Sequence, residues 1–403
     1  MGYNPGSAGG GGSGGGVGGY GTANQIYLDA TFGRDTGKSL STAFNPANAF
    51  LTAQAAFDFI DDNALVGTTL IVRNGSYAGG NLILPFDFTR GNAIVAEGDS
   101  AEFTSAINLS GAGFFEARGL IMNPTDEAAV TMTSAAGIIA RLHGCRITAV
   151  HSSVAVDAYA VEVGALCTCE ILGGSVVQCN FLGASGTLTT TAVVLLDGDF
   201  ATANVIGGRY SVFSQDPENH LAFIHHKGAG SSPRCVLSNI QLAITNTAGI
   251  GSACEASILR SIGSGNLEFI SSGGSLDVTV NTPSTEVIVP LYLDGAGTIV
   301  AKMGSQLVTW NNTPDARVFG AAAAQAGNAA TLLASSFMDL TAEATPGIYT
   351  TPGVLGSVTV GAHNNLGSLV ASALGKGLRL TSPDGGTTQN IGLANGGGVL
   401  AFT

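Results

Sequence analysis

Short runs of alternating apolar and polar residues, joined by corners of one or two residues, dominate the middle of the chain. They recur in ARGLIM, RLHGCRITAV, SVVQCNFLGA, NVIGGRYSVF, VLSNIQLAI and RSIGSGNLEFI. The corner residues are Gly119, Gly144, Cys179, Gly208, Asn239 and Gly263, which lie 25, 35, 29, 31 and 24 residues apart. This spacing indicates coils of roughly 25 residues with inserted loops, each coil burying its inward face on the next. An antiparallel sandwich, whose strands recur about every 8 to 12 residues, is the competing fold. We predict an all-β solenoid over residues 111–289, with a core of Val, Ile, Leu and Cys.

A different pattern precedes the coils, in a cap module that we place at residues 24–110. Apolar residues between positions 49 and 60 recur at helical spacing, Asn48 can cap the start, and the run from Asp61 to Asn63 ends it. A β-branched strand, an Asn-Gly turn at 74–75 and a second strand leading to Pro85 follow. The module should therefore hold one short amphipathic helix and several strands.

The charge balance excludes several classes of partner. Fifteen basic residues stand against 28 acidic ones, giving a net charge of −13, and charged residues make up only 11% of the chain. Such a chain has no cationic surface for nucleic acid or for an anionic membrane. No run of 18 apolar residues and no signal peptide is visible, so we expect no membrane insertion and synthesis in the cytoplasm.

Both ends of the chain differ from the middle. Residues 1–21 contain 12 glycines and no charged side chain, which predicts a flexible arm, assigned to residues 1–23. Residues 290–403 hold nine charged side chains and a net charge of −1, whereas residues 24–289 carry −12. We predict a small C-terminal β domain that packs against other chains. Its alanine-rich segment 321–337 is either a short helix or a connector.

Six cysteines fall within one window of the chain: Cys145, Cys167, Cys169, Cys179, Cys235 and Cys254. The chain is long enough to build a core without disulfides, and the C-T-C spacing at 167–169 places two thiols on one face of a strand rather than in a zinc knuckle. We expect reduced, buried thiols, with a metal site or a disulfide as the alternative. No cofactor is expected.

The cap module carries a recognisable pattern. Its residues are Tyr27, Asp29, Gly33 and Asp35, then Thr52, Gln54 and Ala55, then Thr69, Val72, Gly75 and Tyr77. This pattern resembles the capped start of right-handed parallel β-helices of the pectate-lyase-like superfamily. Asp29 and Asp35 should brace a turn rather than bind calcium.

The order of glycine-rich arm, capped β-helix and C-terminal β domain resembles a bacteriophage tailspike. This resemblance implies a homotrimer located on the virion tail that binds, and sometimes cleaves, host surface polysaccharide. It also implies that residues 1–23 attach to tail or adaptor proteins, and that residues 290–403 serve trimerisation or receptor binding.

Candidate chemistry gathers between residues 151 and 227, where loops interrupt the repeat. Polysaccharide hydrolysis needs two carboxylates about 5 to 10 Å apart, whereas elimination needs a base and a cation. The candidate catalytic residues are Asp197, Asp199, Asp216, Glu218 and His220, with Asp157, Glu162 and His151 one coil earlier. The candidate glycan-binding residues are Tyr159, Tyr210, His225, His226 and Lys227, together with Phe213. The alternative is that these are solvated loop residues and, for Phe213, core. We expect no metal site.

Three classes of function remain open on these grounds. The first is a receptor-binding virion protein, with or without depolymerase activity. The second is a structural virion fibre or decoration protein without glycan activity. The third is a free polysaccharide-degrading β-helix enzyme.

Overall fold

The computed structural model describes residues 24–133, 137–152, 156–183, 189–216, 218–228, 232–247, 255–263 and 267–280. Beyond residue 280 it describes the backbone of the strands alone. The glycine-rich arm predicted at residues 1–23 lies outside the described residues.

Parallel strands stack into three ladders, in which a strand typically pairs with the strand three further along the chain, as β10 does with β13, so that each coil adds one strand to every ladder. Ladder 1 consists of β1 (Gln25–Leu28), β2 (Thr69–Val72), β9 (Ile138–His143), β12 (Thr168–Leu172), β15 (Thr202–Ile206), β22 (Thr298–Met303), β25 (Ala329–Ala334) and β28 (Leu355–Val360). Ladder 2 consists of β3 (Gly75–Tyr77), β5 (Ala101–Phe103), β7 (Ile121–Met122), β10 (Arg146–His151), β13 (Val176–Phe181), β16 (Arg209–Ser214), β23 (Leu307–Asn311) and β26 (Asp339–Ala342). Ladder 3 consists of β8 (Val130–Met132), β11 (Ala158–Gly164), β14 (Thr190–Asp197), β17 (His220–His226), β19 (Glu255–Ser261), β21 (Leu291–Leu293), β24 (Phe319–Ala323) and β27 (Ile348–Thr350).

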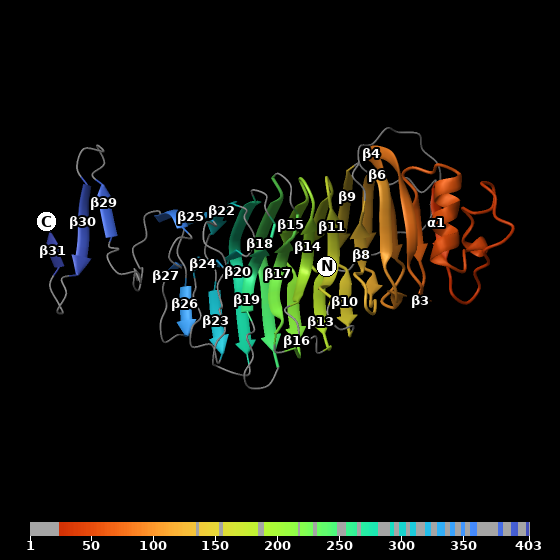
Figure 1. Cartoon of the computed structure of the whole chain (residues 1–403). Coiled ribbons are helices and arrows are strands. Elements are labelled where there is room, and N and C mark those ends of the chain that lie inside the picture. Colours follow the sequence, from red (N-terminus) through yellow and green to blue (C-terminus); the bar gives the residue numbers. More distant parts are fainter. Residues whose placement is uncertain are drawn as a thin grey trace.

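Four long strands turn a corner and belong to two ladders each. β4 (Gly80–Ala96) and β6 (Ile107–Arg118) run from ladder 3 into ladder 1, and β18 (Arg234–Asn246) and β20 (Leu267–Val280) run from ladder 1 into ladder 2. The described coils form an elongated stack with α1 at one end (Figure 1). The chain is a parallel β-helix, so the predicted solenoid is confirmed and the antiparallel sandwich is wrong.

The length of a coil varies along the stack. Ile94 precedes its ladder partner Ala117 by 23 residues, whereas Thr168 precedes its partner Thr202 by 34. Four of the predicted corners, at Gly119, Gly144, Gly208 and Asn239, have positive φ. The corner expected at Cys179 is wrong: Cys179 lies inside β13, buried, and the corner falls at Gly174 with φ 85°. Cys179 is a small apolar residue within an alternating run. Nothing in the local sequence distinguishes a position inside the strand from a position at a corner there.

The parallel pairing does not stop at residue 290. β21 continues ladder 3 from β19, and the ladders proceed to β28. A separate antiparallel sheet follows, made of β29 (Leu378–Thr381), β30 (Thr388–Leu393) and β31 (Leu400–Phe402). The alanine-rich segment expected to be a helix or connector contributes the end of β24 and all of β25 instead, because those strands pair with neighbouring coils. The domain division at residue 290 stays a prediction.

The core is one continuous column of inward-facing side chains. It includes Phe103, Met122, Ile147 and Val177, which follow one another at the same position of successive coils of ladder 2. Five of the cysteines, Cys145, Cys167, Cys169, Cys179 and Cys235, are buried free thiols, as expected, and Cys254 lies outside the described residues. In the described part of the chain no helix is long and apolar enough to cross a membrane.

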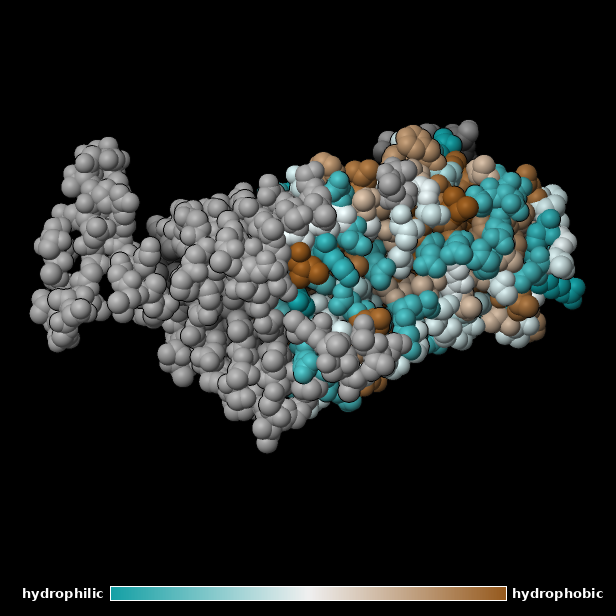
Figure 2. Space-filling model, viewed as in Figure 1, coloured by the Kyte–Doolittle hydropathy of each residue, from teal (hydrophilic) through white to brown (hydrophobic). Residues whose placement is uncertain are grey.

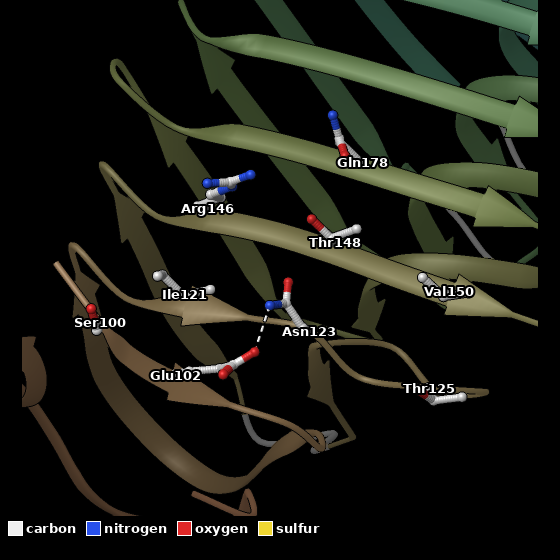
Figure 3. Close-up of a pocket in the computed structure, with 9 residues that line it drawn as sticks. All are labelled: Ser100, Glu102, Ile121, Asn123, Thr125, Arg146, Thr148, Val150 and Gln178. Atoms are coloured by element: carbon white, nitrogen blue, oxygen red, sulfur yellow. Dashed lines mark hydrogen bonds between the residues drawn. The ribbon is translucent and has the colours of Figure 1, made fainter. Parts of the chain in front are cut away.

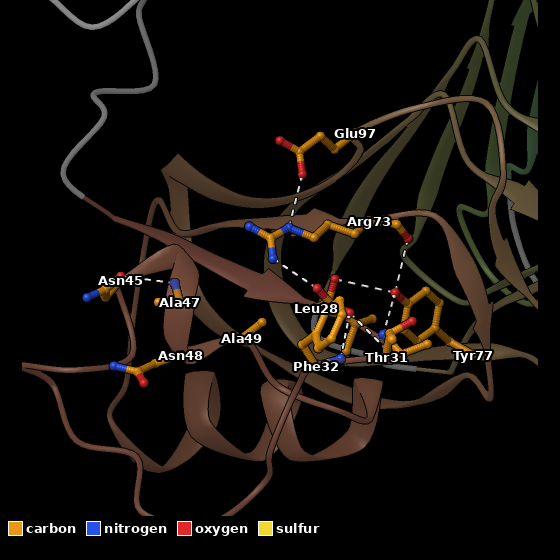
Figure 4. Close-up of polar contacts among 12 residues, drawn as sticks. Leu28, Thr31, Phe32, Asn45, Ala47, Asn48, Ala49, Arg73, Tyr77 and Glu97 are labelled. Carbon is orange, nitrogen blue, oxygen red and sulfur yellow. Dashed lines mark hydrogen bonds and ion pairs between the residues drawn. The ribbon is translucent and has the colours of Figure 1, made fainter.

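The cap covers the first coil with α1 (Ala53–Asp62), whose buried face includes Ala56, Phe57 and Ile60. Thr52 caps its start by accepting a hydrogen bond from the Ala55 amide, and Asn63 is the C-cap. The cap expected at Asn48 is wrong. Asn48 ends a separate short 3₁₀ helix, Pro46–Asn48, which Asn45 caps (Figure 4).

Asp29 and Asp35 brace the turns of the cap, as predicted. Asp29 Oδ1 accepts hydrogen bonds from the Thr31 and Phe32 amides, each 2.9 Å long, and Oδ2 forms a 2.9 Å ion pair with Arg73 (Figure 4). The Phe32 amide and Arg73 hold the pKa of Asp29 below its ordinary value despite its burial. Asp35 accepts from the Leu51 and Thr52 amides and from the Thr52 hydroxyl.

We expect Asp29→Ala to lower the free energy of unfolding by about 2 kcal/mol, because two part-buried amide hydrogen bonds and the ion pair of a partly buried guanidinium lose their acceptor. The pKa of Asp29 is lowered in the fold, so its contribution is present above pH 4 and is lost as the pH falls through its folded pKa. Urea unfolding at pH 7 measures the loss. Asp62→Ala, at the exposed end of α1, is the matched control and should change stability by less than about 0.5 kcal/mol. Equal stability of the Asp29 variant and the control would contradict the bracing role.

Candidate functional site

Ladder 3 bends sharply within its strands. Val193 and Val194 of β14 both face the core, as do Phe223 and Ile224 of β17, and the regular pairing skips Val193 and Phe223. Two successive inward residues break the alternation of a flat strand, so the strand changes direction there. The side chains confirm the bend, because residues at opposite ends of these strands meet on the outer face.

A hydrogen-bonded network crosses this bend. Lys227 follows the end of β17 and Asp157 precedes the start of β11, yet Lys227 Nζ lies 3.1 Å from Asp157 Oδ2. The Tyr159 hydroxyl donates to the same oxygen at 2.9 Å and lies 2.8 Å from His225 Nδ1. Asp157 Oδ1 accepts from the Thr190 amide at 2.9 Å. Groups from three successive coils, including the backbone amide of Thr190, are thereby fixed in one cluster.

Small residues make room for this cluster. Tyr159 stands opposite Ala192, which in turn stands opposite Ala222, and the three pack with Leu195 as an apolar group separate from the main core. A larger residue at position 192 or 222 would occupy the space in which the ring of Tyr159 reaches His225, 5.7 Å away between ring centroids.

The network fixes the charges of its members. Burial raises the pKa of Asp157, but the hydrogen bonds from the Thr190 amide, Lys227 and Tyr159 outweigh it and hold the pKa below its ordinary value. Burial and the nearby Arg260 lower the pKa of His225, so this imidazole is neutral. The Tyr159 hydroxyl donates its hydrogen bond to Asp157, so the Nδ1–H of His225 must donate to the Tyr159 oxygen. The Nε2 of this neutral ring is then a hydrogen-bond acceptor. Among the described residues this buried Nε2 has no hydrogen-bond partner.

Two further carboxyl groups lie where the cluster meets solvent. Glu162 pairs with Leu195 across ladder 3, and Asp197 lies two residues further along the same face of β14. Burial, then the negative charge of Asp197, raises the pKa of Glu162, while Lys227 opposes the rise. Asp197 is exposed and the Lys227 side chain is 46% exposed, so this part of the cluster faces solvent. An acid with a raised pKa beside a second carboxylate and a cation is an arrangement capable of general acid catalysis.

The structure separates the predicted catalytic residues into exposed and buried groups. Asp199 and Glu218 are exposed. Asp216 and His220 are fully buried: Asp216 accepts from the Glu218 amide, and His220 Nε2 lies 3.0 Å from the Ser257 hydroxyl. Buried side chains have no solvent-facing surface for a sugar, so these two support the turn and the sheet. Catalytic roles for Asp199 and Glu218 stay predictions.

The predicted glycan-binding residues also divide. Tyr210 lies in the core, 2% exposed, with its ring 5.0 Å from that of Phe223. His225 and His226 are fully buried and Tyr159 nearly so, which leaves Lys227 as the exposed member of that set. Phe213 faces outward from ladder 2 and is half-buried, so it is not the core residue of the alternative.

Sequence reasoning missed three members of the cluster. They are Thr190, Ser257 and Arg260, all buried, with Arg260 donating to the Thr190 hydroxyl across the bend. An arginine inside the apolar run ASILRSI was the available signal, because a charged residue is rarely buried unless it has a partner. His151, named as a neighbour of this region, is buried and bonds through Nε2 to the Tyr159 carbonyl.

No group of three or more His, Cys, Asp or Glu side chains suited to hold a metal ion occurs among the described residues. Comparisons of the chain with protein-family models, with curated proteins and with solved structures found no match. The likeness to tailspikes therefore rests on the sequence pattern, and the structure adds the parallel β-helix itself.

The buried histidines should make the fold sensitive to acid. Burial lowers the pKa of His226 from 6.5 to about 4, and the pKa values of His151 and His225 are lowered as well. Below pH 6.5 these imidazoles become protonated in the unfolded chain but stay neutral in the folded chain. The free energy of unfolding therefore falls as the pH drops from 6.5 to 4. The loss due to His226 alone is on the order of 3 kcal/mol.

Thermal unfolding of His226→Gln measures this effect. The variant should show a shallower loss of stability across that interval than the unmodified chain. His143→Gln, which changes an exposed histidine, should leave the slope unchanged. Identical slopes for the unmodified chain and His226→Gln would show that His226 does not titrate as the buried geometry requires.

Proposed function

We propose that this chain is a phage tail appendage that attaches to host surface polysaccharide and hydrolyses it at the bent outer face of ladder 3. The observation that supports hydrolysis is that burial and the nearby charge of Asp197 raise the pKa of Glu162, while Lys227 acts on the same carboxyl group. Environments that raise the pKa of one carboxyl group near a second one are the usual basis for acid and base roles in glycosidases.

The roles follow from position and charge. Glu162, with its raised pKa, donates its proton to the glycosidic oxygen as the bond from that oxygen to the anomeric carbon breaks. The carboxylate of Asp197 takes a proton from the water whose oxygen forms the new bond to that carbon. Lys227 lies beside both carboxylates, and its ion pair with Asp157 holds it in place. Tyr159 and His225 position Asp157 behind the reacting groups.

Attachment to a virion is supported by the sequence. The cap pattern, the glycine-rich arm and the charge-poor C-terminal segment fit a homotrimeric tailspike whose residues 1–23 dock on tail or adaptor proteins. A rigid solenoid with irregular segments leading into ladder 3 is a suitable support for groups that act on a long polymer. No metal or cofactor enters the proposed chemistry.

We expect Glu162→Gln and Asp197→Asn each to slow the release of reducing ends by about 100-fold or more, because each removes one partner of the proton transfer. The assay uses purified capsular and lipopolysaccharide O-chain polymers of bacterial surfaces. Cleavage should decline as the pH rises through the raised pKa of Glu162, since only its protonated form donates.

Asp199→Asn is the matched control, because Asp199 is exposed two residues beyond Asp197 and its carbonyl bonds to the Leu166 amide. If Asp199→Asn abolishes cleavage and Glu162→Gln does not, the acid has been misassigned. Binding without cleavage by the unmodified chain would refute hydrolysis and leave a pure adhesin. Absence of both binding and cleavage would favour a structural fibre.

The proposed assembly predicts a native mass of about 120 kDa, three times the 40.2 kDa of the chain, in native mass spectrometry or sedimentation. A species of one chain mass at micromolar concentration would contradict the homotrimer and favour a free enzyme.

A further inference from the structure

A second candidate binding surface lies on the outer face of ladder 2, a different ladder from the one that carries the acid pair. A groove of about 700 Å³ is lined by Ser100, Glu102, Ile121, Asn123, Thr125, Arg146, Thr148, Val150 and Gln178. These residues come from β5, β7, β10 and β13 and the segments beside them, and those drawn in Figure 3 line one face of successive strands.

The register of ladder 2 orders the groove into columns. Glu102, Ile121 and Arg146 are successive partners in one column, which continues through Val176 to Arg209. Neighbouring strands are about 4.8 Å apart, so Arg146 and Arg209 are separated by roughly 10 Å along the solenoid. Thr148 and Gln178 form a second column, two residues further along the same strands. They supply neutral hydrogen-bonding groups beside the arginines.

The two arginines differ from four other arginines in the described part of the chain. Arg73, Arg118, Arg141 and Arg234 each pair with a carboxylate on their own or a neighbouring strand. Arg146 and Arg209 are exposed, and neither forms an ion pair within the part of the chain that the structure describes. On a protein with a net charge of −13, two unpaired guanidinium groups aligned on one face provide a local positive site.

The charged residues along this column determine the orientation in which an anionic ligand can bind. Glu102 lies at one end and accepts a 2.7 Å hydrogen bond from Asn123 Nδ2, and its negative charge disfavours an anion there. Arg146 lines the groove away from Glu102, and Arg209 follows in the same column two strands beyond Arg146, outside the lining of the groove. A planar guanidinium can bind a carboxylate through two hydrogen bonds. Ile121 and Val176 alternate with the charged residues in the same column and offer apolar contacts to the C–H faces of sugar rings.

On this geometry we propose that the outer face of ladder 2 binds an acidic polysaccharide, aligned with the solenoid axis, through carboxylates seated on Arg146 and Arg209. The separation of the two arginines is comparable to that of carboxylates on alternate sugars of an extended chain. The hydroxyl groups of the intervening sugar face Thr148 and Gln178, and those of the next sugar toward Glu102 face Asn123. The site binds without catalysis, and it is independent of the cluster on ladder 3.

Titration of the full-length protein with hyaluronate, with alginate and with neutral dextran tests the proposal by isothermal calorimetry. We expect at least one acidic polymer to bind more tightly than dextran, with affinity that falls as salt rises from 50 to about 300 mM. Arg146→Ala and Arg209→Ala should each weaken that binding about tenfold, and Arg146→Lys should restore only part of it, since lysine keeps the charge without the planar fork.

Arg90→Ala removes one exposed positive charge elsewhere and should leave binding within twofold. The proposal is overturned if both acidic polymers bind no better than dextran, if the double variant Arg146→Ala/Arg209→Ala binds as the unmodified chain does, or if Arg90→Ala weakens binding equally. Glu162→Gln is expected to keep full affinity for the acidic polymer. Failure of the hydrolysis proposal is therefore distinguishable from failure of this one.

Discussion

Parallel pairing between successive coils is the constraint on which the rest of this structure depends. Each coil is a short chain segment that cannot bury its inward side chains alone, and it becomes stable by stacking on the coils before and after it. The strict register keeps like positions in columns, so that Phe103, Met122, Ile147 and Val177 lie over one another. The first coil has no predecessor, and the cap with α1 covers its exposed end.

The same columns govern the outer faces. A residue that points outward is brought beside the outward residues of the neighbouring coils, whatever the sequence distance between them. Arg146 and Arg209 are 63 positions apart in the sequence but two strands apart on ladder 2. A rigid stack therefore sets the spacing of surface groups in steps of about 4.8 Å, which suits a ligand that is itself a repeating polymer.

The bend in ladder 3 has a different consequence, because it brings together the two ends of the same strands. Polar side chains on the outer face of a straight strand would point apart into solvent. Here the bend brings the outward side chains together, so that Asp157, Tyr159, His225 and Lys227 form one bonded network in which Lys227 alone is largely exposed. Burial raises the pKa of the Tyr159 hydroxyl and lowers that of the His225 imidazole, whereas hydrogen bonds hold the pKa of Asp157 below its ordinary value. The cluster thus gathers several ionisable groups in a chain that has few of them.

The sequence by itself determined the class of fold, because coil-length recurrence of glycine and asparagine corners is a local signal that persists in one dimension. It also indicated that Asp29 braces a turn, that the thiols are buried, and that residues 151–227 hold the polar cluster. The tertiary structure decided which of those residues meet. Local pattern placed Tyr210 and His226 among surface groups, yet each faces the core, because the inward or outward sense of a residue depends on where the strand bends. The partners Thr190 and Arg260, and the arginine column on ladder 2, depend on the inter-coil register, which variable loop lengths hide from the linear sequence.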